Sequence, residues 1–122
     1  MLRRYNGQWG FSEGNAVSFG VNEAIFIQFL LDELYAAYLL RLNGRGNRKF
    51  ELVIEDGQPW MPWTNKDFCD EFPFWSGHQI RRIISSCKEQ GVIKTANYNS
   101  NPWDQRLWYT VMGANVNEWT TN

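Results

Sequence analysis

The sequence predicts an α+β fold in one domain, and three observations lead to this prediction. A long apolar run at 22–42 has the length and the end signals of a helix. Two further segments, 65–71 and 76–90, follow capping residues and have helical spacing. The segments between and after these helices are rich in β-branched and aromatic residues. With 122 residues, of which 43% are apolar, the chain suits a single compact core.

The two ends of the chain carry little periodicity. Residues 1–20 contain Gly7, Gly10 and Gly14 and predict an irregular arm, with a short strand at 16–19. Residues 113–122 form a tail without a period, which we expect to fray. The folded domain is therefore expected to span 21–112.

The long helix is expected to begin at Asn22, a good N-cap, and to end at Asn43 and Gly44. It is apolar on almost every side. Because one small domain should cover only part of such a helix, we expect a homodimer built on helix 22–42. Asp32 and Glu33 lie near the middle of the apolar run and argue against a membrane span, so no membrane partner is expected.

A glycine-rich basic loop at 43–49 leads into a predicted strand at 50–54. Asp56 and Gly57 predict a tight turn, and the segment 58–63 predicts the returning strand. Pro59 and Pro62 cannot donate ladder hydrogen bonds, so this strand is expected to be short or to lie at the sheet edge.

The helix at 65–71 is expected to be capped by Thr64 and stopped by Pro73, and the helix at 76–90 to be capped by Ser76 and stopped by Gly91. The second helix is clearly amphipathic. Its apolar stripe consists of Ile80, Ile83, Ile84 and Cys87. The opposite side carries His78, Arg81, Arg82, Ser85 and Glu89.

Two β-rich runs, 92–98 and 106–112, are separated by a turn-forming cluster and predict a hairpin with a long tip. The order is thus long helix, strand, short helix, turn, amphipathic helix and hairpin. That is the order of a winged helix-turn-helix with a long N-terminal helix and a C-terminal β-hairpin wing. We expect Trp60, Trp63, Trp75 and Trp108 in the core, whereas Trp103 lies in the turn cluster and should contact solvent or a partner.

The residues from Trp60 to Lys94 also carry a resemblance to a known family. This segment reads W-M-P-W-T-N-K-D-F-C-D-E-F-P-F-W-S-G-H-Q-I-R-R-I-I-S-S-C-K-E-Q-G-V-I-K, and the run D-Q-R-L-W-Y-T-V follows at 104–111. Together they resemble the winged-helix domain of phage and plasmid replication-initiation (replisome organiser) proteins, over about residues 17–112. The sequence departs from the family where Cys87 replaces the usual leucine.

The resemblance implies double-stranded DNA as the partner, with helix 76–90 in the major groove and hairpin 92–112 as the wing. It implies a role in replication initiation or transcriptional regulation of a phage or mobile element, with replication proteins as possible further partners. The residues expected to face the groove are His78, Gln79, Arg81, Arg82 and Ser85. The residues expected to pair with phosphates are Arg41, Arg45, Arg48, Lys49, Lys94 and Arg106. Asn99, Asn101 and Trp103 are expected to follow the DNA backbone at the wing.

The distribution of charge along the chain is compatible with DNA binding but does not require it. The whole chain has a net charge of −1, so DNA binding would require a local patch, and positive charge does gather in 41–49 and in 76–112. The near-zero charge, the aromatic surface and the apolar first helix leave open the alternative of a winged helix that binds protein without DNA.

An enzyme is disfavoured by the sequence. No metalloprotease, phosphate-loop or serine-triad motif occurs, and His78 is the single histidine. No cofactor is expected. Cys69 and Cys87 lack metal-site spacing, so we expect reduced thiols and a cytoplasmic protein.

Overall fold

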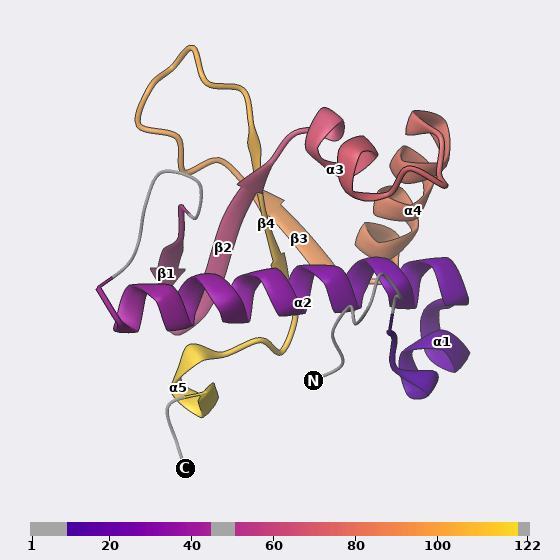
Figure 1. The fold of residues 1–122 in the computed structure, drawn as a ribbon, viewed down its shortest axis with the longest axis horizontal. Helices are drawn as coiled ribbons and strands as arrows, with labels where there is room; N and C mark the ends of the chain where they lie inside the picture. Colours follow the sequence, from indigo (N-terminus) through magenta and orange to yellow (C-terminus); the bar gives the residue numbers. More distant parts are fainter. Residues whose placement is uncertain (1–9, 45–50, 120–122) are drawn as a thin grey trace.

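The computed structural model describes residues 10–44 and 51–119, which form five helices and one four-stranded antiparallel sheet (Figure 1). The α+β prediction is confirmed. The elements in chain order are α1 (Glu13–Phe19), α2 (Val21–Leu42), β1 (Val53–Glu55), β2 (Gln58–Trp63), α3 (Asn65–Glu71), α4 (Gly77–Glu89), β3 (Ile93–Ala96), β4 (Leu107–Val111) and α5 (Val116–Trp119).

The sheet has the strand order β1-β2-β4-β3. Strands β1 and β2 form a hairpin through the predicted turn, in which Asp56 and Gly57 both have positive φ, as a two-residue hairpin turn requires. Strands β3 and β4 form the second hairpin, with Ile93 opposite Val111 and Ala96 opposite Trp108. Strand β4 also pairs with β2, with Met61 opposite Tyr109. The second hairpin is therefore joined to the rest of the sheet through β4.

We expected 58–63 to be a short strand or a strand at the sheet edge, but β2 has six residues and a neighbour on each side. Continuing the register by two residues would bring Pro59 opposite Val111. The side chain of Gln58 donates to the carbonyl of Val111 at 2.9 Å, and so supplies a donor beside the proline. Strand β1 pairs with β2 only as far as Trp60, so it has ended before Pro62. The two prolines thus occupy places where the ladder does not need their missing N–H groups.

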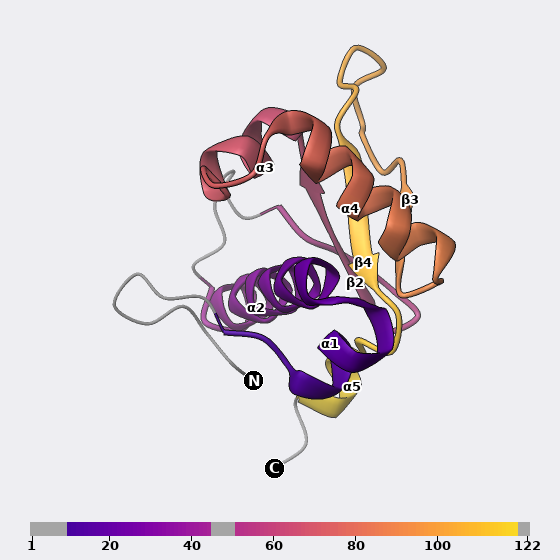
Figure 2. The same cartoon turned by 90° about the vertical axis from the view of Figure 1, so that its right-hand side faces the viewer.

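The core lies where α2 crosses the sheet and meets α3 and α4 (Figures 1 and 2). Its centre is aromatic, with the ring of Phe26 5.1 Å from that of Phe68 and the ring of Phe29 5.0 Å from that of Phe72. Three of the tryptophans expected in the core are buried, namely Trp63, Trp75 and Trp108. The fourth, Trp60, is half-buried against Tyr98.

The N-terminal arm differs from its prediction. Residues 16–19 belong to a helix, α1, and not to a strand, because Ser12 accepts a hydrogen bond from the amide of Asn15 and caps a helical turn. Helix α2 follows directly after Gly20, whose φ of 112° separates the two helices. The predicted cap, Asn22, lies inside α2, whereas the predicted end at Asn43 is confirmed.

The tail also differs from its prediction, since residues 113–119 are packed against the domain. The ring of Trp119 lies 5.3 Å from that of Tyr35 and 5.8 Å from that of Tyr38, and Val116 is buried. The amide of Val116 donates to the carbonyl of Gly57 at 2.8 Å. Short helix α5 therefore covers one side of α2.

This packing covers part of the surface on which we expected a dimer to form. We expected part of α2 to stay uncovered, but the chain's own α1 and α5 lie along it (Figure 2). The large apolar side chains of α2 that remain exposed are Val21 and Leu42, one at each end of the helix. None of the helices in the described residues combines the length and the apolarity that a membrane span requires.

Candidate nucleic-acid interface

Helix α4 is fixed firmly at its N-terminus. The Ser76 side chain accepts from the amide of Gln79 at 3.1 Å, and the Gln79 side chain accepts from the amide of Ser76 at 2.8 Å. This reciprocal pair is a capping box and fixes where the helix begins. It also occupies the side-chain oxygen of Gln79, which we had expected to face DNA.

One side of α4 is anchored and the opposite side faces solvent. Ile80, Ile83, Ile84 and Cys87 are all buried, as predicted. Burial, together with the nearby charge of Glu23, raises the pKa of the Cys87 thiol to about 12, so this cysteine acts as a small apolar core residue. All five groove-facing candidates are exposed, namely His78, Gln79, Arg81, Arg82 and Ser85.

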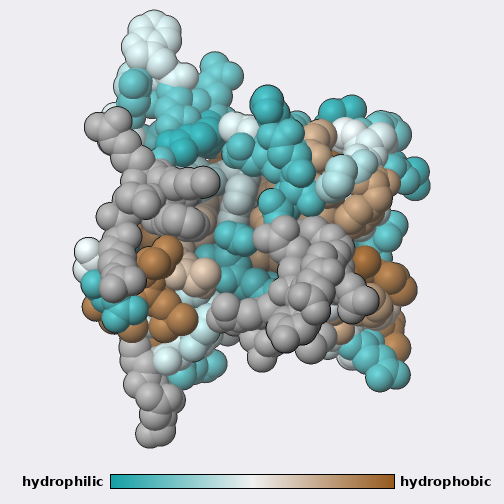
Figure 3. Space-filling model, viewed as in Figure 1, coloured by the Kyte–Doolittle hydropathy of each residue, from teal (hydrophilic) through white to brown (hydrophobic). Residues whose placement is uncertain are grey.

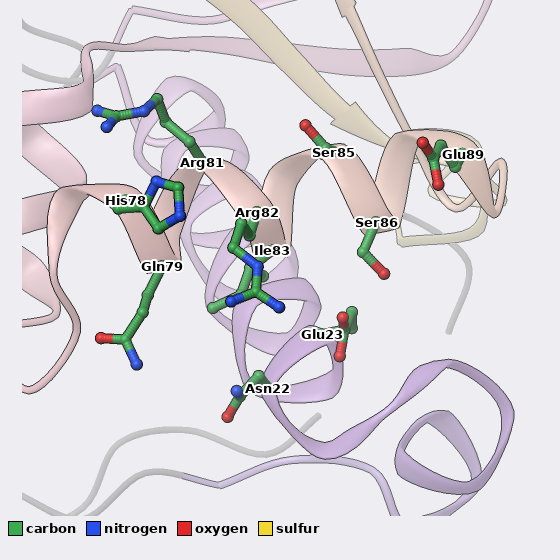
Figure 4. Close-up of a pocket in the computed structure, with 10 residues that line it drawn as sticks. All are labelled: Asn22, Glu23, His78, Gln79, Arg81, Arg82, Ile83, Ser85, Ser86 and Glu89. Carbon is green, nitrogen blue, oxygen red and sulfur yellow. The ribbon is translucent and has the colours of Figure 1, made fainter.

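A shallow groove of about 550 Å³ runs between the outer side of α4 and the N-terminus of α2. Figure 4 shows the groove, with Arg82 extended over α2 towards Asn22 and Glu23, and Arg81 turned the other way along α4. Asn22 and Glu23 were not among the predicted site residues. Their only signal in the sequence is their position at the start of the long helix, which does not reveal that α4 lies alongside.

The two arginines of α4 keep their charge available. Within residues 10–44 and 51–119, no ion pair joins Arg81 or Arg82 to a carboxylate. Acidic side chains line the same groove at Glu23 and at Glu89, near the C-terminal end of α4. The most positive part of this surface is therefore the first two turns of α4.

The loop between β3 and β4 is held by its own side chains. The side-chain NH2 of Asn99 donates to the carbonyls of Asp104 and Arg106, both at 2.8 Å, and its side-chain oxygen accepts from the indole N–H of Trp108 at 2.7 Å. The side chain of Asn99 is thus used inside the loop, contrary to our expectation that it would contact DNA. Asn101 is exposed, and its side chain accepts from the amide of Trp103 at 2.9 Å.

Arg106 is not placed as a phosphate contact. Its guanidinium bonds Asp104 at 2.6 Å and Glu51 at 2.8 Å, so two carboxylates surround one cation. These hydrogen bonds raise the pKa of Arg106 and lower that of Asp104. Sequence reasoning missed this arrangement because Glu51 lies 55 residues away in the chain.

The remaining candidates are dispersed. Lys94 is exposed on β3, and Arg41, at the end of α2, donates to the carbonyl of Leu52. Arg45, Arg48 and Lys49 lie outside the described residues. In Figure 3 the upper part of the molecule, over α3 and the β3–β4 loop, is hydrophilic, whereas brown gathers at the level of α2.

Two further findings concern metal binding and similarity to known proteins. Among the described residues, no group of three or more histidine, cysteine or acidic side chains is arranged to hold a metal ion. Comparisons of the chain with family models, curated proteins and solved structures found no match.

Proposed function

We propose that the chain is a winged-helix DNA-binding protein, with α4 as the recognition helix and the β3–β4 hairpin as the wing. The support from the fold is its order. Helix α2, strand β2, helices α3 and α4, and strands β3 and β4 follow one another as in a winged helix-turn-helix, and β4 lies between β2 and β3. Strand β1 and helices α1 and α5 are additions to that arrangement.

The observation that carries the proposal is the pair Arg81 and Arg82. Both are exposed on the side of α4 opposite its buried isoleucines, and neither is neutralised by a described carboxylate. An arginine held in this way can bond the O6 and N7 atoms of guanine in the major groove or pair with a phosphate.

The charges along α4 also suggest how DNA would approach. Arg81 and Arg82 lie in the second turn, whereas the last turn carries both Lys88 and Glu89, whose charges offset each other. The excess of positive charge therefore lies in the N-terminal half of α4, which is the part that should enter the groove. That orientation is the usual one for a recognition helix.

Salt-dependent binding of the whole chain to a mixed-sequence DNA duplex, followed by fluorescence anisotropy, tests the proposal. We expect wild-type affinity to fall steeply with salt, and the double substitution R81A/R82A to reduce the salt slope by about two. The control is Lys66→Ala, which removes an exposed cation that Asp70 already pairs on α3 and should leave the slope unchanged. Absence of duplex binding by the wild type would reject the proposal and favour a protein-binding winged helix.

The biological role we propose rests on the resemblance of 60–94 and 104–111 to replisome organiser proteins. It is replication initiation, or transcriptional regulation, of a phage or mobile element. A duplex containing the replication origin of the element that encodes the chain would then be bound more tightly than a duplex of unrelated sequence.

A further inference from the structure

The β3–β4 loop presents one tryptophan to solvent in a defined way. Trp103 is 87% exposed, whereas Trp63, Trp75 and Trp108 are each at most 9% exposed. Trp103 lies in a tight turn in which the amide of Asp104 donates to the carbonyl of Asn101 at 3.0 Å. The Asn101 side chain bonds the Trp103 amide as well. The indole therefore projects from a turn that two hydrogen bonds to Asn101 hold in place.

The base of the loop is braced too. Asn99 ties together both arms of the hairpin through the carbonyls of Asp104 and Arg106 and the indole of Trp108. The pairing of Arg106 with Glu51 then links the loop to the segment that precedes β1. A loop built in this way holds an exposed indole at small cost in conformational freedom on binding.

The chemistry of the loop does not suit phosphates. Between 97 and 106 the single cation is Arg106, and Asp104 and Glu51 already surround it. What the loop offers instead is an indole, a proline and the carboxamides of Asn97, Asn101 and Gln105, all exposed. Carboxamides bond the edges of bases, and an apolar side chain can enter between base pairs from the minor groove.

The position of the loop fits that chemistry. Figure 2 shows α4 across the front of the molecule and the β3–β4 loop rising beside it. If α4 occupies the major groove, a loop on the same side of the molecule reaches the neighbouring minor groove.

We propose that Trp103 is an intercalating wedge, which enters a base-pair step from the minor groove beside the α4 site and kinks the DNA. This inference rests on the proposed function, and it replaces our expectation that the wing follows the phosphate backbone. It predicts preference for flexible pyrimidine–purine steps, such as TA, at the wedge position.

The test uses the whole chain and a duplex of about 30 base pairs that the wild-type protein selects from a randomised pool. Dyes at the two ends report DNA bending by energy transfer. We expect the wild type to bend the duplex and Trp103→Ala to abolish the bend and weaken binding about tenfold. The salt slope should stay unchanged, because an indole displaces no counterions. Trp103→Phe keeps a smaller aromatic ring and should retain part of the bend. The control is Val17→Ala, at an exposed apolar site on α1, which should retain the whole bend.

Each other outcome has a distinct meaning. If Trp103→Ala bends and binds the duplex as the wild type does, the wedge proposal is overturned and the proposed function stands. If Trp103→Ala loses a self-association that the wild type shows in sedimentation, and still bends the duplex, Trp103 is a contact between protein copies. That result also overturns the wedge proposal. Failure of the wild type to select or bind any duplex would overturn both proposals.

Discussion

Residues of one type have different chemical roles in this chain, as its arginines show. Arg106 lies between Asp104 and Glu51 and braces a loop, whereas Arg81 and Arg82 are exposed without a described partner. In the sequence all three belong to the positively charged segment 76–112 and lie within a predicted helix or strand. The difference arises from Asp104, two residues away in the chain, and from Glu51, which is distant in the chain and became visible as a partner only in three dimensions.

The pairing of Arg106 makes a prediction about acid. Its hydrogen bond lowers the pKa of Asp104 below the ordinary value of 3.8. A carboxyl whose pKa is lowered by folding stabilises the folded loop at pH values above its ordinary pKa. That contribution is lost as the pH falls through the lower pKa of the folded state. In a ¹³C NMR titration, Arg106→Gln should therefore raise the midpoint of the Asp104 carboxyl towards 3.8. An unchanged midpoint would show that the pair does not form in solution.

At the scale of elements, helix α4 depends on its capping box. Removal of the Ser76 hydroxyl leaves the amide of Gln79 without its acceptor, so Ser76→Ala should lower the free energy of unfolding by about 1 kcal/mol. Urea unfolding followed by circular dichroism measures this loss. The matched control is Ser85→Ala, on the exposed side of the same helix, which should cost nothing. Equal stability of the two variants would contradict the assigned role of Ser76.

Elements with strong local signals could be predicted from the sequence. Thr64 and Ser76 cap α3 and α4 as expected, and the Asp56–Gly57 turn lies where it was predicted. Predictions from the sequence were wrong where a residue distant in the chain determines the local structure. The long-range bond from Gln58 to Val111 accommodates Pro59 inside the sheet. Likewise, Val116 and Trp119 form α5 only where α2 and Gly57 provide a surface.

The candidate site was predictable to a similar extent. Helical periodicity correctly separated the buried and exposed sides of α4. Periodicity could not show that the side chains of Gln79 and Asn99 bond within the chain, or that Glu23 lines the groove. The contacts of Asn99 and Glu23 depend on how the ends of elements meet, whereas the bond of Gln79 follows a local pattern, the capping-box spacing from Ser76 to Gln79.

At the scale of the whole molecule, the C-terminal segment is part of the domain. Trp119 packs on Tyr35 and Tyr38 of α2, so Trp119→Ala should lower the free energy of unfolding by about 2 kcal/mol. The control is Trp103→Ala, which removes an indole that is already exposed and should leave stability unchanged in urea unfolding. If both substitutions leave stability unchanged, α5 does not pack on α2 in solution.

The central claim is that the outer side of α4 and the tip of the β3–β4 loop together form a DNA-binding surface. Amide chemical shifts of the ¹⁵N-labelled chain, recorded as duplex DNA is added, test this claim most directly. The account predicts that the largest changes fall in 77–86 and 97–105, while α5 and the outer side of α3 change little. Changes concentrated on α3 or α5, with α4 unaffected, would contradict it.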